Sequence, residues 1–502
     1  MPAQDDSSPI QTSPTQTPPQ GVSSASTTPV GLSPIIEPIS NPGQGGATPE
    51  PQQVSSPTSP ETPPPPKKDF PKIVVILGIV VLVFVLFVVV WKLVLPRLNK
   101  SEEITLTWWG LWEDSSVVAP LIYEYEQQNP KITINYVKQS HQDYRERLTN
   151  ALAQGSGPDI FRFHNTWVPM FKGELDSVPA SVMSAAEYAE SYFSIISSDL
   201  TNETGLAGIP LSYDALTLYI NEDLFEAAGK SVPATWDDLR QLAIELTIKD
   251  EEGTITQAGV ALGRTENVDH WPEILGLMML QNGANPAKPT DQRAEDALTY
   301  FTIFSSVDGV WDETLPASTV SFAAGKLAMY FGPTWRAFEI SQQNPELKFK
   351  TVPLPQLPKD TPTQPDISYA TYWAEGVWTR GSNKDAAWEF MKFISSRTSL
   401  ESMYQNASAT RAFGEPYPRT DMAELLTSHP IVGSVVTQAP DAQSWYLASR
   451  TFDGPTGINT QINKYYKDAI NAVNLGERSD KALETVVAGV AQVLSQYGLV
   501  SR

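Results

Sequence analysis

The 502-residue chain contains no cysteine. This absence excludes disulfides, thiol nucleophiles and thiolate metal sites, and it excludes attachment to a membrane through a lipidated cysteine. The chain has only four histidines, and their spacing is not typical of a metal site, so the sequence indicates neither zinc nor any other cofactor. The glycine-containing turn at 155–158 lacks the Lys-Ser/Thr ending of a phosphate-binding loop.

Basic residues are scarce as well, and the formal net charge is -22. An acidic chain is repelled by phosphate backbones, so nucleic acid is not expected as a partner. Residues 1–66 contain no Lys or Arg and are rich in Pro, Ser, Thr, Gln and Gly. Because such a segment buries too little apolar surface to fold, residues 1–72 are predicted to form a disordered tail.

Charge is absent altogether from residues 73–91, IVVILGIVVLVFVLFVVVW. As a helix, with a rise of about 1.5 Å per residue, this run approaches the thickness of a bilayer core. It is too long for the apolar part of a signal peptide, and no small-residue cleavage site follows it. We therefore expect one transmembrane helix over 73–95, which enters the lipid bilayer through residues 73–91, and a linker over 96–103. The basic residues that flank the run are balanced, so charge alone does not set its orientation.

Strand and helix patterns alternate from residue 104 onward. Residues 104–109 and 131–137 read as strands, 117–129 and 141–154 as helices, and a third strand begins after the turn at 157–158. This order predicts an α/β domain with a largely parallel sheet and ligand-accessible loops at the carboxyl ends of the strands. Further helices are expected at 222–228, after an N-cap at Thr235, and at 294–304, 318–324, 386–395, 457–474 and 480–497.

A series of longer motifs resembles one protein family. They are ITLTWWGLWED, GSGPDIF, GIPLSYDALTLYINEDLFEAAGKSVPATWDDL, FAAGKLAMYFGPTW, AAWEFMKFISS and YYKDAINAVNLGERSDKALETV, in this order over 104–497. The segment resembles the extracellular solute-binding proteins of ABC importers, in the carbohydrate-binding group that includes maltose-binding protein. Members of that family commonly begin with a cleaved or lipidated signal, and this chain departs from them in its proline-rich tail and apolar run.

The resemblance implies an α/β fold with two lobes and a hinge, like that of periplasmic binding proteins, here preceded by the transmembrane helix and the tail. It places lobe 1 at about 104–210 and 371–425, lobe 2 at about 211–370 and 426–502, and the crossing strands near 209–213 and 368–373.

The resemblance also implies a receptor and no enzyme. Such a protein binds a small solute, here a mono- or oligosaccharide, in the cleft between its lobes and delivers it to the membrane subunits of an ABC importer. Because the domain must meet the solute, we expect the N-terminus in the cytoplasm and the C-terminal domain outside the cell.

Sugar binding requires an aromatic platform for the C–H face of the ring and planar polar side chains around its hydroxyl groups. Tryptophans and polar residues stand together at several predicted loops. The candidate ligand-binding residues are Trp112, Glu113, Asn165, Trp167, Tyr213, Asp214, Trp271, Trp335, Trp373, Glu375 and Arg411. Other roles compete with binding, since Trp236 and Trp388 are expected in the core and Arg411 could form a structural salt bridge.

Two other classes of function stay open at this point. A cell-surface glycosidase would use a pair of carboxylates, such as Glu113 or Asp114 with Asp214 or Glu375, at about 5–10 Å from one another. A sensor ectodomain is the second class, although the tail contains no folded signalling domain. The ligand itself is also open, because polyamines and polyols bind to related two-lobed folds.

Overall fold

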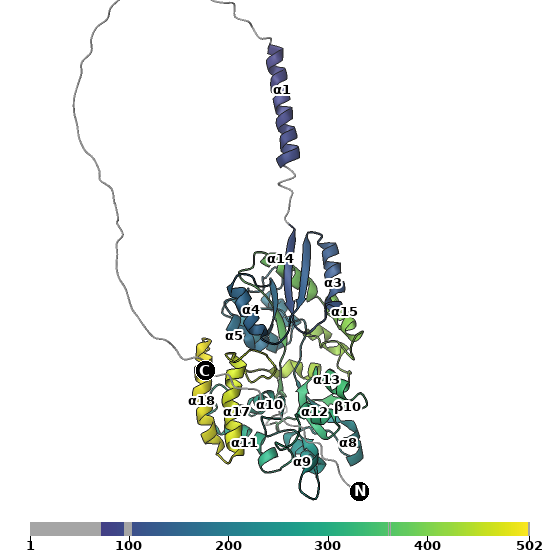
Figure 1. Cartoon of the computed structure of the whole chain (residues 1–502), viewed down its shortest axis with the longest axis vertical. Helices are drawn as coiled ribbons and strands as arrows, with labels where there is room; N and C mark the ends of the chain where they lie inside the picture. The colour runs from purple at the N-terminus through teal and green to yellow at the C-terminus, as the bar shows by residue number, and fades with distance from the viewer. Residues whose placement is uncertain (1–71, 95–102, 360, 362, 500–502) are drawn as a thin grey trace, which may run out of the picture. The chain divides into compact units, whose positions relative to one another are not determined.

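The computed structural model describes residues 72–94, 103–359, 361 and 363–499 (Figure 1). The tail predicted over 1–72 and the linker predicted over 96–103 lie outside these residues, apart from Lys72 and Glu103. The chain separates into two units, residues 1–87 and 88–502, and each is described by itself.

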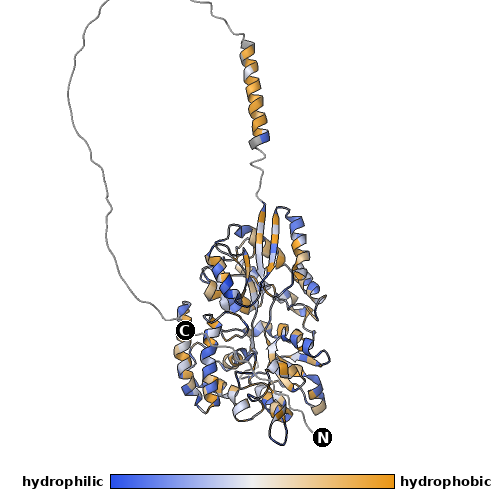
Figure 2. Ribbon diagram, in the orientation of Figure 1, coloured by the Kyte–Doolittle hydropathy of each residue, from blue (hydrophilic) through white to orange (hydrophobic). Residues whose placement is uncertain are grey.

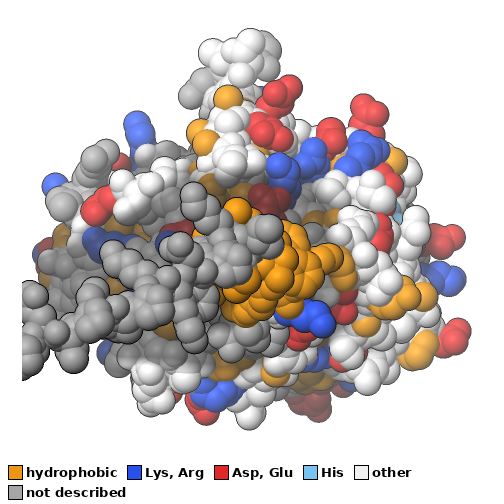
Figure 3. All heavy atoms as spheres, turned by 90° about the horizontal axis from the view of Figure 1, so that it is seen from above, with side chains coloured by type: hydrophobic (Ala, Val, Ile, Leu, Met, Phe, Trp, Pro, Cys, Tyr) orange, Lys and Arg blue, Asp and Glu red, His pale blue; other side chains and the backbone are white. Residues whose placement is uncertain are grey.

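Helix α1 (Lys72–Val89) continues into a π-helical turn at Val90–Val94. Most of its large apolar side chains are exposed, and Figure 2 shows an almost uninterrupted hydrophobic ribbon. In Figure 3 the most extensive group of apolar side chains forms one compact patch and smaller apolar groups lie elsewhere, whereas acidic and basic side chains are mixed. By length and apolar content taken together, no helix among the described residues qualifies as a membrane span. Within the described residues the helix expected over 73–95 is present as far as Val94, but its predicted role as a transmembrane segment is not supported by the structure.

The first sheet has the predicted β-α-β-α-β order. Strand β1 (Ile104–Gly110) pairs in parallel with both β2 (Ile132–Lys138) and β3 (Ile160–His164). Strand β12 (Trp373–Val377) comes from a distant part of the chain and adds an antiparallel edge next to β3, which gives the order β12-β3-β1-β2. The prediction of a largely parallel sheet is therefore confirmed.

Amphipathic helices cover this sheet (Figures 1 and 2). In α3, Val117, Val118, Leu121 and Tyr125 recur at helical spacing and are buried, and the helix contacts β2. The helices of this lobe are α3 (Ser115–Gln128), α4 (Tyr144–Ala153), α5 (Val168–Phe171), α6 (Ala185–Ser191), α7 (Ser194–Asp199), α14 (Lys384–Ile394) and α15 (Arg397–Ser408).

The second sheet has the order β10-β6-β9-β8-β7 and is mixed. Strands β6 (Leu216–Asn221) and β9 (Leu327–Pro333) lie antiparallel and are buried along their whole length, as expected for strands covered on both faces. The other strands are β7 (Ile248–Lys249), β8 (Ile255–Val260) and β10 (Phe349–Val352). The helices of this lobe are α8 (Glu222–Ala228), α9 (Trp236–Leu246), α10 (Trp271–Gln281), α11 (Gln292–Ser306), α12 (Ser318–Ala323), α13 (Arg336–Gln343), α16 (Gly433–Gln438), α17 (Ile458–Asn474) and α18 (Ser479–Gln496).

The N-cap predicted at Thr235 is confirmed. The Thr235 hydroxyl accepts a hydrogen bond from the Asp238 amide at 3.1 Å, and the Asp238 carboxylate accepts one from the Thr235 amide, which forms a complete capping box at the start of α9. Helix α8 matches its predicted bounds. Seven helices were not predicted, namely α5, α6, α7, α10, α13, α15 and α16.

Two crossing segments run side by side between the sheets. Ile209 and Glu375 exchange backbone hydrogen bonds of 2.9 and 3.0 Å, and Ala215 bridges Ala370. Residues 209–215 lead directly into β6 of the second sheet, while residues 368–372 lead into β12 of the first. A third segment joins them, because β11 (Ser368–Tyr369) pairs with β13 (Ala442–Gln443). The crossings thus lie where the resemblance implied, while the exact lobe boundaries stay a prediction.

Candidate functional site

A cavity of about 490 Å³ lies between the two sheets, next to the crossing segments. It falls within the size range of small-molecule sites. Its walls combine aromatic rings with charged and polar side chains. The lining residues are Trp112, Glu113, His141, His164, Ser212, Asp214, His270, Glu273, Pro333, Trp335, Arg336, Phe338, Glu339, Gln342, Thr371, Tyr372, Trp373, Arg411, Glu415, Ser449, Arg450 and Phe452.

Aromatic rings form the wall on the side of the first lobe. Trp112 lies in the turn after β1, and its ring meets that of Trp373, the first residue of β12, edge to face at 5.6 Å. His141 stacks on Trp112 at 5.8 Å, and Phe452 contacts both rings. The carboxyl end of β1 therefore carries an aromatic platform of the kind that a sugar ring needs.

The Arg162 cluster, which we define as Arg162, Glu113 and Glu375, lies behind this wall. Arg162 on β3 is 2% exposed, and its Nη2 atom lies 2.6 Å from Oε1 of Glu375, while Nη1 pairs with Glu113. Glu375 is directly opposite Arg162 on β12. Burial raises the pKa of Glu375 to about 7 although Arg162 opposes the shift. Of the two carboxylates, only Glu113 lines the cavity.

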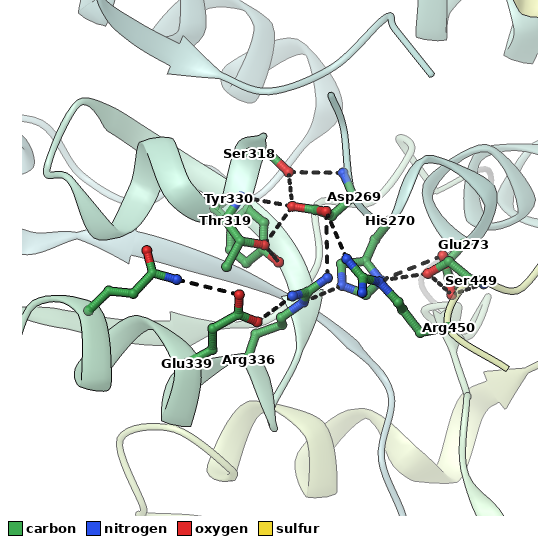
Figure 4. Close-up of polar contacts among 11 residues, drawn as sticks. Asp269, His270, Glu273, Ser318, Thr319, Tyr330, Arg336, Glu339, Ser449 and Arg450 are labelled. Atoms are coloured by element: carbon green, nitrogen blue, oxygen red, sulfur yellow. Dashed lines mark hydrogen bonds and ion pairs between the residues drawn. The ribbon is translucent and has the colours of Figure 1, made fainter. Parts of the chain in front are cut away.

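The Arg336 cluster forms the opposite wall, on the second lobe (Figure 4). We define it as Arg336, Asp269, His270, Glu273, Glu339 and Ser449. Arg336, the first residue of α13, is 2% exposed and pairs with Glu339 at 2.5 Å. Its guanidinium stands 4.5 Å from the ring of Trp335 and thereby supports that ring at the cavity.

Hydrogen bonds in the Arg336 cluster have a defined direction. Nε of Arg336 donates to Nε2 of His270 at 2.9 Å. Because arginine only donates, His270 carries its proton on Nδ1, which lies 3.0 Å from the hydroxyl of Ser449. That hydroxyl in turn donates to Oε1 of Glu273 at 2.9 Å. Burial lowers the pKa of His270, so the ring is neutral. It accepts a hydrogen bond from Arg336 and donates one to Ser449, and so links the arginine to the carboxylate of Glu273.

Asp269 anchors this cluster from the other side. Its Oδ2 atom accepts hydrogen bonds from the amide and the hydroxyl of Thr319, at 3.0 and 2.7 Å. Burial alone would raise the pKa of Asp269, but the hydrogen bonds from Thr319 and the charge of Arg336 lower it to about 2.

Asp214 sits between the two walls, on the first crossing segment. Its carboxylate accepts hydrogen bonds from the amides of Ala215, Thr334 and Trp335 and from the hydroxyl of Thr334. Burial raises its pKa to about 7, and the charge of nearby Glu415 adds to the shift, although the hydrogen bonds from Thr334 and Ala215 oppose it. Asp214 therefore fixes the loop that carries Trp335.

Six of the eleven residues predicted for ligand binding line the cavity: Trp112, Glu113, Asp214, Trp335, Trp373 and Arg411. Arg411 also forms the salt bridge that competed with a binding role, with Glu415 at 2.8 Å.

The other five do not line the cavity. Trp167 and Tyr213 are fully buried, Trp167 stacked on Tyr144 and Phe171 and Tyr213 packed against Phe193. Trp271 is buried in the first turn of α10, and Glu375 lies behind the wall on Arg162. The side-chain amide of Asn165 donates a hydrogen bond to Asp199. Asn165 lines a separate, smaller cavity.

Sequence reasoning missed most of the Arg336 cluster. From this part of the chain the candidate residues include only the two tryptophans Trp271 and Trp335. One signal was available: Pro272 favours the first turn of a helix, which would have revealed α10 and placed His270 at its N-cap and Glu273 in its first turn. Within the described part of the chain, no group of three His, Asp or Glu side chains is arranged to hold a metal ion.

Comparison with known proteins places this geometry in context. The sequence model of the bacterial extracellular solute-binding protein family matches residues 110–399. A binding protein of Brucella abortus is 23% identical over 277 residues, and the multiple sugar-binding protein of Streptococcus mutans is 22% identical over 281 residues. These matches cover 54% and 51% of the chain and 66% and 63% of the relatives, so the chain spans just under two thirds of their length.

Solved structures share the fold at low sequence identity. An ABC transporter solute-binding protein of Thermotoga lettingae, bound with α-D-tagatose, has a TM-score of 0.60 at 20% identity and covers 78% of this chain and 100% of its own. A cyclo/maltodextrin-binding protein complexed with maltotetraose has a TM-score of 0.63 at 17% identity and covers 79% of this chain and 98% of its own. At these identities the likeness establishes the two-lobed α/β fold of periplasmic binding proteins.

Proposed function

This chain belongs to the bacterial extracellular solute-binding protein family, and we propose that it captures a mono- or oligosaccharide in the cavity between its lobes and delivers it to an ABC importer. The observation that carries the proposal is the pairing of aromatic walls from two lobes around one cavity, with Trp112 and Trp373 on one side and Trp335 on the other. A sugar ring can meet an aromatic face on each side, while the polar groups between them bind its hydroxyl groups.

Because the two walls belong to different lobes, ligand binding can drive closure of the lobes. A ligand that contacts both walls gains all its interactions only when the lobes are close together, so binding shifts the population toward the closed form. The crossing segments, together with the third segment that joins them at β13, bend in this motion. The membrane subunits of the importer then distinguish the loaded protein from the empty one.

Binding without chemistry accounts for the carboxylates better than hydrolysis does. A glycosidase needs two carboxyl groups free to reach a glycosidic bond. Both oxygens of Asp214 accept hydrogen bonds from the chain, and Glu375 lies fully buried on Arg162. The family and the structural neighbours are likewise binding proteins.

A thermal-shift screen of the full-length chain in detergent, against mono- and oligosaccharides, tests this function. A sugar that binds the folded state increases the free energy of unfolding, by about 2.7 kcal/mol at a concentration one hundred times its Kd. The melting temperature rises as a result. The sugar should be recovered intact after incubation. A screen in which no sugar shifts the transition contradicts the binding role, and shorter products after incubation support the glycosidase.

Delivery is tested in the cells that produce the protein. Uptake of the labelled sugar should fall when the chain is deleted and return with the wild-type chain. It should not return with the double variant Trp335→Ala/Trp373→Ala. Unchanged uptake in the deletion strain contradicts delivery to an importer.

The proposal includes a tether to the lipid bilayer through residues 73–91, with the N-terminus in the cytoplasm and the domain outside. It rests on the uncharged sequence and on the exposed apolar side chains of α1. The full chain should sediment with membranes and resist extraction with carbonate, whereas a chain that lacks residues 73–91 should not. Protease added to intact cells should remove the domain. A full chain that stays in the soluble fraction contradicts the tether.

A further inference from the structure

Two hydroxyl side chains at the cavity each lie beside a buried histidine. The hydroxyl of Thr371, on the second crossing segment, is 3.1 Å from Nε2 of His164, and that of Ser449 is 3.0 Å from Nδ1 of His270. All four residues line the cavity, and Thr371 and Ser449 are partly exposed. Because a hydroxyl group has a single hydrogen, the way each histidine uses its nitrogens decides whether that hydrogen is left for a ligand.

The proton of His164 is placed by the residues behind it. The side-chain amide of Asn459 donates to the carbonyl of Tyr446 at 2.9 Å, which fixes its orientation, and its oxygen accepts from the Thr166 hydroxyl at 2.8 Å. The same hydroxyl is 2.8 Å from Nδ1 of His164 and has no second hydrogen, so the hydrogen in that contact belongs to the ring. The contact of Nδ1 with the Thr166 amide is longer, 3.4 Å, and does not compete. His164 is therefore protonated on Nδ1.

The Thr371 hydroxyl follows from this assignment. Burial lowers the pKa of His164 to about 3, so the ring is neutral and its Nε2 atom is an acceptor. The Thr371 hydroxyl donates to Nε2 at 3.1 Å. Its hydrogen is thereby used, and its oxygen can only accept from a ligand.

Ser449 reaches the same condition by a different route (Figure 4). His270 accepts from Arg336 at Nε2, so its Nδ1 atom donates to the Ser449 hydroxyl. That hydroxyl donates its own hydrogen to Oε1 of Glu273 at 2.9 Å. One lone pair of the Ser449 oxygen remains, and it can only accept.

We propose that Thr371 and Ser449 are specificity-determining residues, whose oxygens accept hydrogen bonds from two hydroxyl groups of the solute. His164 and His270 are positioning residues, since they fix the hydrogens of these two side chains. The inference rests on the proposed function, because it takes the solute to be a sugar. A sugar hydroxyl can donate at both places, whereas a fluorine or an ether oxygen cannot.

Calorimetric titration of the full-length chain in detergent tests the direction of these hydrogen bonds. Glucose, galactose, mannose, maltose and cellobiose are compared, and the tightest binder is then replaced by its deoxy and deoxyfluoro analogues, one hydroxyl at a time. Because fluorine cannot donate, the fluoro analogue should bind as poorly as the deoxy analogue at two positions or more, about tenfold or more below the parent sugar. Fewer than two such positions overturn the inference.

Thr371→Val and Ser449→Ala assign these positions, which is necessary because the carboxylates of the lining accept as well. Each variant should bind the parent sugar about tenfold or more weakly, and the penalty for fluorine should fall below about threefold at one position in Thr371→Val and at another in Ser449→Ala. A general disturbance of the fold would weaken parent and analogues alike. Thr149→Val, an exposed change on α4 outside the cavity, should alter neither affinity. A fluorine penalty that is unchanged in either cavity variant overturns the inference.

Nuclear magnetic resonance of the histidine nitrogens tests the two rings even where the cavity variants do not fold. The chain has four histidines, so His141→Gln and His429→Asn, made singly, identify two of the four sets of signals. The other two sets, from His164 and His270, should both show a protonated Nδ1 and an unprotonated Nε2 at neutral pH. A protonated Nε2 in either ring overturns the inference.

The outcomes separate this inference from the proposed function. If a sugar binds and fluorine is tolerated at every position, the sugar receptor stands and the inference fails. If no sugar binds, in these titrations or in the thermal-shift screen, the sugar receptor fails and the inference about its hydroxyl groups fails with it.

Discussion

Two buried arginines, Arg162 in the first lobe and Arg336 in the second, are held in different ways. Both are 2% exposed. Arg162 directs its nitrogens to two carboxylates, of which Glu375 is fully buried. Arg336 divides its nitrogens between Glu339, which is 41% exposed, and the neutral ring of His270. The first is a compact ion triad, and the second is a polar network with one side in water.

The different partners of the two arginines correspond to different ways of holding the residues that line the cavity. The Arg162 cluster ties β3 to β12 and to the turn after β1, so it fixes the strand ends that carry Trp112 and Trp373. The Arg336 cluster joins α13 to α10 and to the loop at Ser449, and its chain of hydrogen bonds ends at the carboxylate of Glu273. The first cluster therefore ties strands of one sheet together, while the second connects α13 and α10 to the wall of the cavity.

Replacing Arg162 should have the largest effect on stability. Arg162→Met leaves two buried carboxylates without a cation, and the free energy of unfolding should fall by about 3–5 kcal/mol. Chemical denaturation of the full chain measures it. Arg380→Met, which removes an exposed pair with Glu174, is the control and should cost less than about 1 kcal/mol. A loss for Arg162→Met as small as the control would contradict the ion triad.

Replacing Arg336 should cost less, about 2 kcal/mol. After Arg336→Met, Glu339 turns to water and Asp269 keeps the hydrogen bonds from Thr319, so the main loss is the donor to His270. The same denaturation series measures the change. If Arg336→Met destabilises the chain as much as Arg162→Met, the contrast between the clusters is wrong.

Local patterns in the sequence predicted much of the fold. The capping residues of α9 and the bounds of α8 are set within a few neighbouring residues, so they can be read from the chain. Trp112 was placed correctly after the first strand for the same reason, whereas the position of Trp373 at the second crossing came from the family resemblance. The family resemblance supplied the order of the lobes, which no local pattern contains.

The polar clusters could not be predicted in this way, because they depend on contacts between distant segments. Glu375 has the same strand face as Trp373, yet it lies behind the wall because Arg162 stands opposite it on β3. Trp167 follows the polar residues Asn165 and Thr166, yet a short 3-10 turn directs its ring into the core. Neither the register of β12 nor the direction of that turn follows from composition.

The aromatic residues of both walls should contribute to affinity rather than stability. Trp373→Ala and Trp335→Ala should each weaken binding of the tightest sugar at least tenfold, about 1.4 kcal/mol, since each removes a platform on one lobe. Titration calorimetry measures both. Trp271→Phe is the control, because Trp271 does not line the cavity, and the affinity of this variant should equal that of the wild type. If both alanine variants bind as tightly as the wild type, the aromatic walls do not form the binding site.

Glu375 and Asp269, one from each cluster, should make contributions to the free energy of unfolding that change with pH in opposite directions. Each change should be on the order of 1 kcal/mol. The pKa of Glu375 is raised from 4.5 to about 7 by burial, so its contribution is present at low pH and is lost as the pH rises through that window. The pKa of Asp269 is lowered from 3.8 to about 2, because the hydrogen bonds from Thr319 and the charge of Arg336 outweigh burial. Its contribution is present above pH 4 and is lost as the pH falls toward 2.

Unfolding curves recorded from pH 2 to 8 separate these responses. In the wild type the free energy of unfolding should decline between pH 4.5 and 7. Glu375→Gln should flatten this decline, since the amide does not titrate, and should leave the free energy of unfolding below pH 4 unchanged. Asp269→Asn should flatten only the acid side, below pH 4. If either variant changes the opposite side, or if both change the same side, the two arginines do not differ in the way their partners indicate. The pH profile is therefore the finest test of whether one lobe is fixed by charge and the other by a hydrogen-bonded network.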